Sequence, residues 1–150
     1  MLSAAKRFFD KHFSADSAAS DVDDDARLRL AVAALLVEVL RADYDVSGPE
    51  RRQVLSSIRD VLALDADAAE QLLMMAEEEI DTSHDLYQFT SRINRAFSAE
   101  QKQRLVEQLW RVAQADETVH KYEEHIIRRV SDLLHVPHSA FIAAKLRAEN

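Results

Sequence analysis

Residues 32–50 (VAALLVEVLRADYDVSGPE) decide the fold, because residues 105–123 (LVEQLWRVAQADETVHKYE) repeat their pattern. When the first stretch is shifted by 73 residues onto the second, six of the 19 positions are identical. Each copy combines an apolar helix, an Ala-Asp-x-x-Val loop and a second helix with a glutamate in its first turn. The repeat therefore predicts a duplicated helix-loop-helix unit. The identical pairs are Leu36/Leu109, Val39/Val112, Ala42/Ala115, Asp43/Asp116, Val46/Val119 and Glu50/Glu123.

The second helix of the unit is also repeated, after a one-residue gap that changes the shift to 72. Apolar residues of the two copies then coincide at the spacing of one helix face. We expect the two units to pair through their flanking helices, so that the acidic loops face each other across a pseudo-twofold axis. The coinciding pairs are Val54/Ile126, Leu55/Ile127, Ile58/Val130, Val61/Leu133, Leu62/Leu134 and Leu64/Val136.

The rest of the chain is also predicted to be helical. One glycine and two prolines are too few for the turns of an all-β fold or for a glycine-rich phosphate loop. Apolar periodicity and capping signals predict an all-α bundle of about seven helices. Trp110, Phe89 and the pair Met74-Met75 lie in the apolar patterns, so we expect them in the core. The helices are expected at 26–42, 47–62, 66–80, 84–96, 98–115, 121–134 and 137–148.

The chain is acidic, with 19 basic and 27 acidic residues and a formal charge of −8. Without a concentrated basic patch such a surface repels phosphate backbones, so we expect no nucleic-acid partner. It favours cations or basic protein partners. The absence of cysteine excludes disulfides, thiolate zinc sites and cysteine nucleophiles. No apolar run approaches the roughly 18 residues of a membrane span and no signal peptide is recognisable, so the expected location is cytoplasmic.

The sequence divides into an N-terminal segment, residues 1–25, and a helical domain, residues 26–150. Residues 2–13 have the pattern of an amphipathic helix in which Phe8, Phe9 and Phe13 lie among basic residues. Two interpretations stay open for them. They form a helix packed on its own domain, or an arm that contacts a protein partner or the inner face of a membrane. Residues 14–25 are rich in Ser, Ala and Asp and are expected to form a linker.

Two motifs carry a resemblance to a known family. Ala42-Asp43-x-x-Val46-x-x-x-Glu50 and its second copy, which ends at Glu123, resemble the signature of the TerB-like family, named for bacterial tellurite resistance. The domain type is also similar to the N-terminal domain of the DjlA co-chaperones. The similarity covers roughly residues 26–147, although Tyr44 and Glu117 stand where a glycine usually follows the aspartate. The resemblance implies an all-helical domain with a divalent-cation site on its acidic face.

The chemistry of the acidic loops can be weighed separately. Asp43 and Asp116 follow the carboxyl ends of apolar helices, where the helix dipole disfavours a negative charge by about 0.3–1 kcal/mol. Glu50 and Glu123 lie in helix first turns, where the dipole favours a carboxylate, so a capping role is an alternative for them. If these four carboxylates converge, they suit a hard ion such as Ca²⁺ or Mg²⁺, with Mn²⁺ as a further candidate. Two further carboxylates can assist them, Asp45 and Glu117.

The expected function is binding rather than catalysis. His120 and His125 are five residues apart, not the four that place two zinc ligands on one helix face. No nucleophile elbow, phosphate loop or kinase signature is present. The leading hypothesis is divalent-cation binding at the paired acidic loops, and the resemblance implies that this binding is coupled to a stress response or to membrane-associated assemblies. The alternative is a metal-independent protein-interaction module, akin to the co-chaperone domain, whose acidic face docks a basic partner.

Overall fold

The computed structural model describes residues 19–42, 48–82, 85–115, 119 and 121–149. Over these ranges the chain forms seven helices and no strand, which confirms the predicted all-α fold. The helices are α2 (Ala19–Ala42), α3 (Gly48–Leu62), α4 (Ala66–Thr82), α5 (Leu86–Ala96), α6 (Ala99–Ala113), α7 (Lys121–Leu133) and α8 (His138–Glu149).

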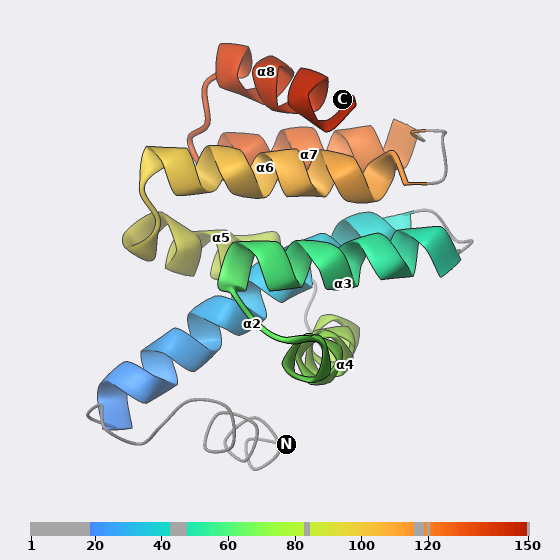
Figure 1. Cartoon of the computed structure of the whole chain (residues 1–150). Helices are drawn as coiled ribbons and strands as arrows, with labels where there is room; N and C mark the ends of the chain where they lie inside the picture. Colours follow the sequence, from blue (N-terminus) through green and yellow to red (C-terminus); the bar gives the residue numbers. More distant parts are fainter. Residues whose placement is uncertain (1–18, 43–47, 83–84, 116–118, 120, 150) are drawn as a thin grey trace.

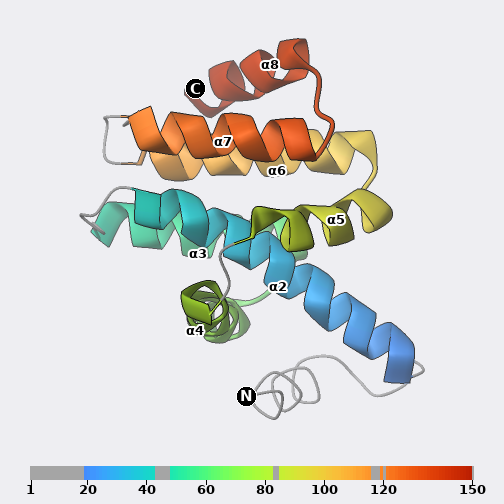
Figure 2. The ribbon, with the colours of Figure 1, turned by 180° about the vertical axis from the view of Figure 1, so that it is seen from behind.

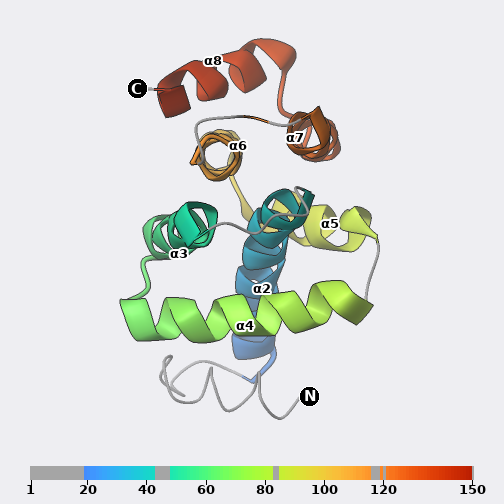
Figure 3. The same cartoon turned by 90° about the vertical axis from the view of Figure 1, so that its right-hand side faces the viewer.

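Two helical hairpins, α2–α3 and α6–α7, form the centre of the molecule (Figure 1). Helix α2 packs on α6 and α7, and α3 packs on α6, so the two repeated units pair as expected. Helix α5 packs on α2 and α7 (Figure 2). Helix α4 crosses the bundle on one side and α8 crosses it on the other (Figure 3). All residues from Ala31 to Val37 are buried, as the central position of α2 requires.

Burial shows which residues of the two hairpins are equivalent. Val54 and Ile127 are both 0% exposed, and they match at a shift of 73. The expected match of Val54 with Ile126 is therefore wrong, because Ile126 is only partly buried. Near the helix ends the equivalent residues are Ala63 and His135, at a shift of 72, since both have a positive φ. The one-residue gap thus lies in the second half of α3 and α7.

Helices α3 and α7 end in the same way, without a glycine. Ala63 and His135 adopt the left-handed backbone, with φ of 56° and 61°. The Leu64 N–H donates to the Arg59 carbonyl at 3.3 Å, and α7 has the equivalent bond at 2.9 Å. Helix C-caps of this kind usually have glycine at the left-handed position, because a Cβ in the left-handed region costs roughly 1–2 kcal/mol. Both hairpins therefore contain local backbone strain at this end.

We expect Ala63→Gly to raise the free energy of unfolding by about 0.5–1 kcal/mol. The substitution removes the Cβ strain, and the larger conformational freedom of glycine in the unfolded chain offsets part of that gain. Urea denaturation measures the change. Ala143→Gly, at a partly exposed position in the interior of α8 with ordinary φ, is the matched control and should be destabilising. A destabilised Ala63→Gly variant would contradict this interpretation.

Helix starts follow local capping chemistry. The sequence Ser98-x-x-Gln101 predicts a capping box at the start of α6, and it is present: the Ser98 hydroxyl accepts from the Gln101 N–H at 3.2 Å, and Gln101 Oε1 accepts from the Ser98 N–H at 2.7 Å. Helix α2, expected from residue 26, instead begins at Ala19, so residues expected in the linker form its first turns. An ion pair of Asp25 with Arg29 at 2.9 Å, one helical turn apart, stabilises this extension.

The core contains the expected aromatic residues but only one of the two expected methionines. Trp110 is 0% exposed and Phe89 is 5% exposed. Met75 packs partly against the core. Met74, in contrast, is 57% exposed, so its predicted core position is wrong. The physical reason is the helical spacing, which turns Met74 away from the face of α4 that covers α2.

A buried polar network joins α3 to α6. The Ser57 hydroxyl donates to Gln108 Oε1 at 2.8 Å, and Gln108 Nε2 donates to Asp60 at 3.2 Å. Ser57 and Gln108 are 0% and 6% exposed. At the equivalent positions of the α2–α7 pair stand Val130 and Leu35, both apolar and 0% exposed. At these equivalent positions the α3–α6 contact is therefore polar and the α2–α7 contact is apolar.

We expect Gln108→Leu to lower the free energy of unfolding by about 1–3 kcal/mol, because the buried Ser57 hydroxyl loses its acceptor. The double variant Ser57→Val/Gln108→Leu copies the apolar pair of the other side. It should recover to within about 1 kcal/mol of the wild type, since the two buried polar groups are removed together and Gln53, which donates to Ser57 at 3.1 Å, is partly exposed to water. Urea denaturation of both variants checks this. Gln103→Leu, on the same helix but partly exposed, is the control.

Candidate functional site

The helix ends that flank the two acidic loops lie at the same end of the bundle, on the right in Figure 1 and on the left in Figure 2. Helix α2 ends at Ala42 and α3 begins at Gly48. Helix α6 ends at Ala113 and α7 begins at Lys121. Figure 3 looks onto this end of the molecule. The pairing of the hairpins thus brings the equivalent termini of both units to one end.

Glu50 and Glu123 are the two predicted ligands that the structure describes, and both are 0% exposed. Each lies in the first turn of its helix, as the sequence predicts. The helix N-terminus favours a carboxylate there. A fully buried carboxylate is nevertheless costly, because it has lost its hydration and requires donors, cations or a metal ion in return. Their burial sets these glutamates apart from ordinary surface caps.

Sequence reasoning located the two glutamates but did not predict their burial. The signal was present in the helical spacing. Glu50 lies one turn before Val54, and Glu123 lies one turn before Ile127, so each glutamate begins the buried stripe of its helix. A carboxylate in line with a core stripe is removed from water when the hairpins pair. The equivalence of the two sites follows from the repeat.

The other predicted site residues lie outside the described residues. They comprise the loop carboxylates of the proposed site and the N-terminal phenylalanines. Among the described side chains, no group of three or more His, Asp or Glu residues is arranged to hold a metal ion. The two buried glutamates are therefore the described part of the predicted ligand set. The residues outside the description are Asp43, Asp45, Asp116, Glu117, Phe8, Phe9 and Phe13.

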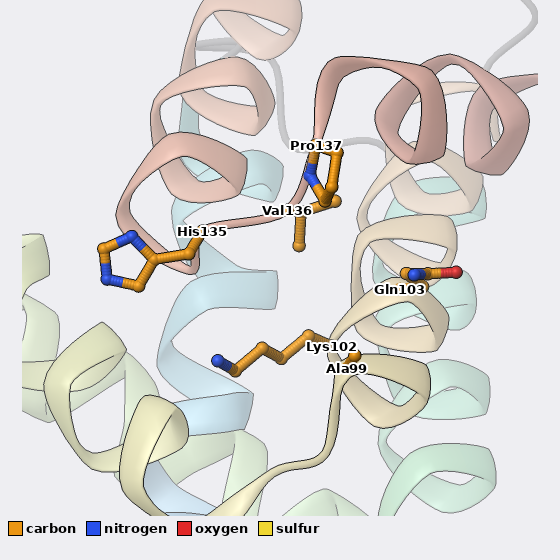
Figure 4. Close-up of a pocket in the computed structure, with 6 residues that line it drawn as sticks. All are labelled: Ala99, Lys102, Gln103, His135, Val136 and Pro137. Atoms are coloured by element: carbon orange, nitrogen blue, oxygen red, sulfur yellow. The ribbon is translucent and has the colours of Figure 1, made fainter.

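A shallow pocket of about 90 Å³ lies at the opposite end of the bundle, between the start of α6 and the α7–α8 connection (Figure 4). The Lys102 side chain extends toward the side of the His135 ring, whereas Gln103 points away. The pocket is small beside the 300–1,000 Å³ typical of ligand clefts. Its lining contains no carboxylate, and it lies far from the helix ends that flank the acidic loops. The lining residues are Ala99, Lys102, Gln103, His135, Val136 and Pro137.

Comparison with known proteins agrees with the repeat and with the helical architecture. The family model described as tellurite resistance protein TerB matches residues 29–146. This chain belongs to the TerB family. The match spans both helical hairpins and the helices between them, close to the range over which the motifs suggested a resemblance. No curated protein and no solved structure matches the chain. In the described part of this TerB-family chain, no helix is long and apolar enough to cross a membrane.

We expect a short distance between two spin labels placed at the end of the bundle where α3 and α7 begin. Arg52 of α3 and Lys121 of α7 are exposed, and the chain has no cysteine, so Arg52→Cys/Lys121→Cys can be labelled cleanly. Pulsed electron paramagnetic resonance should give a shorter distance for this pair than for Arg52→Cys/Ala99→Cys, which spans the length of the bundle. The reverse order would show that the two loops do not share an end.

Proposed function

We propose that this TerB-family domain is a non-enzymatic module that binds one divalent cation between its two acidic loops. Asp43, Glu50, Asp116 and Glu123 are the proposed ligands, assisted by the carboxylates of Asp45 and Glu117. The observation that carries the proposal is the burial of Glu50 and Glu123, both 0% exposed, at equivalent positions of paired hairpins. The common location of the flanking helix ends supports a shared ion rather than two separate ones.

The proposed ligands suit a hard cation. Ca²⁺ takes six to eight oxygen ligands, and Mg²⁺ and Mn²⁺ also prefer carboxylates and water. Carboxylates gathered at one end repel each other, and a divalent ion offsets this repulsion. The first turns of α3 and α7 add partial positive charge, which favours the ionised glutamates. The metal-free domain therefore retains unfavourable electrostatic energy that the ion removes.

A shared ion links the two hairpins. Because it binds only where both loops are in place, it stabilises the folded chain by mass action. In such a module, the stability and the conformation of the end with the two acidic loops depend on the local concentration of the divalent ion. The family description as a tellurite-resistance protein is consistent with a role in a stress response. The domain would then present its ion-loaded end to a protein partner.

We expect Ca²⁺, Mg²⁺ or Mn²⁺ to raise the melting temperature of chelator-treated protein. At a 100-fold excess over Kd, binding contributes about 2.7 kcal/mol, which corresponds to a rise of roughly 5–10 °C for a domain of this size. Glu50→Gln and Glu123→Gln, which preserve side-chain volume, should each abolish most of the shift. If one ion is shared, each single variant should lose the thermal shift. If the two sites are independent, each single variant should keep half of the ion binding. Calorimetry should give one ion per chain.

Glu100→Gln is the matched control, because Glu100 is also in a helix first turn but is exposed and belongs to α6 at the other end of the bundle. It should retain the full shift. Absence of heat and of thermal stabilisation with all three ions at millimolar concentration would contradict the proposal. That outcome would favour the metal-independent module, whose acidic end docks a basic protein.

A further inference from the structure

Helix α4 packs on α2 with one face and leaves the opposite face in water. The packed face is apolar and includes Ala69, Leu72, Leu73 and Ala76, all 0% exposed. The opposite side presents four exposed residues at helical spacing, which we call the outer face of α4. Three of them are carboxylates and one is a large apolar side chain that is 57% exposed. The outer face consists of Asp67, Glu70, Met74 and Glu78.

The outer face belongs to a strongly acidic helix. Helix α4 contains six acidic residues and no basic one. Arg51 of α3 contacts Glu77 at 3.0 Å and Glu70 at 3.7 Å, and the hydrogen bond with Glu77 raises the pKa of Arg51. With Arg51 included, α4 still has a large excess of negative charge. An exposed methionine among carboxylates suits a basic amphipathic helix, because methionine adapts to aromatic side chains and the carboxylates attract Lys and Arg.

The chain itself contains a segment of this chemistry. Residues 2–13 include three basic residues and one acidic residue in a chain of net charge −8. The same stretch includes three phenylalanines at the spacing of a helix face. We propose that residues 2–13 dock on the outer face of α4 of the same chain. The phenylalanines contact Met74, and Lys6, Arg7 and Lys11 contact the surrounding carboxylates.

The tether favours this docking within one chain. Residues 14–18 separate the segment from the start of α2 at Ala19, and the connection spans about 20 Å when extended. Helix α4 packs directly on α2, and the start of α2 extends beyond the bundle on the same side as α4 (Figures 1 and 3). A short tether gives a millimolar effective concentration, so weak contacts suffice. An anionic membrane is disfavoured nearby, since α4 would repel it.

Paramagnetic NMR on the full chain tests the docking. The chain has no cysteine, so Gln71→Cys accepts a spin label beside the outer face without removing any of its residues. We expect paramagnetic broadening from this label to weaken the majority of the amide signals of residues 6–13. The same label at Ile142→Cys, an exposed position on α8 across the bundle, should leave them unchanged. Equal effects from both labels, or none from either, would overturn the proposal.

Charge exchange separates docking from a general loss of structure. Lys6→Glu/Lys11→Glu should abolish the weakening caused by the Gln71→Cys label. Adding Glu70→Lys/Glu78→Lys to that variant should restore it, because the opposite charges face each other again. A lack of restoration contradicts the charge contact. If vesicles of phosphatidylserine and phosphatidylcholine broaden residues 2–13 while the Gln71→Cys label does not, the segment binds membranes and the docking is wrong.

Discussion

The structure depends on one packing constraint: the apolar faces of two similar helical hairpins must be buried against each other. Residues 31–37 of α2 form no polar face that water could solvate, so α2 lies at the centre and packs on both helices of the other hairpin. Both hairpins follow the same pattern, and the first helix of each packs on the second helix of the other. Such pairing brings the helix ends that flank both turns to one end of the bundle and buries Glu50 and Glu123 together. The burial of these two glutamates is therefore a consequence of how the core is packed.

The two halves differ where their surroundings differ. The α3–α6 contact has the hydrogen-bonded pair Ser57 and Gln108, whereas Val130 and Leu35 occupy the equivalent positions. Helix α8 also covers α6. The ring centroids of Trp110 and Phe141 are 5.3 Å apart, and Arg147 forms an ion pair with Glu107 at 2.6 Å. These differences give the duplicated fold a unique arrangement, since a buried polar pair penalises the exchanged or shifted packing.

Local chemistry made much of the fold predictable. Apolar periodicity identified the helices, and a capping box such as that of Ser98 and Gln101 located a start accurately. The early start of α2 was missed because its acidic residues resemble a linker in composition, although the helix dipole favours acidic residues at a helix N-terminus. Met74 and the burial of Glu50 and Glu123 depend on which helix face meets a neighbour, which is a tertiary property. The candidate site could thus be located by its repeat, but the burial of its two described glutamates could not be predicted.

Anomalous scattering from crystals grown with manganese tests most directly whether one ion is shared between the two hairpins. We expect one anomalous peak per chain at the end formed by the two acidic loops, within ligand distance of carboxylates from both hairpins. Two peaks, each held by one loop, would show that the repeats bind ions separately. No peak at saturating manganese would show that Glu50 and Glu123 are buried for a reason other than a metal ion.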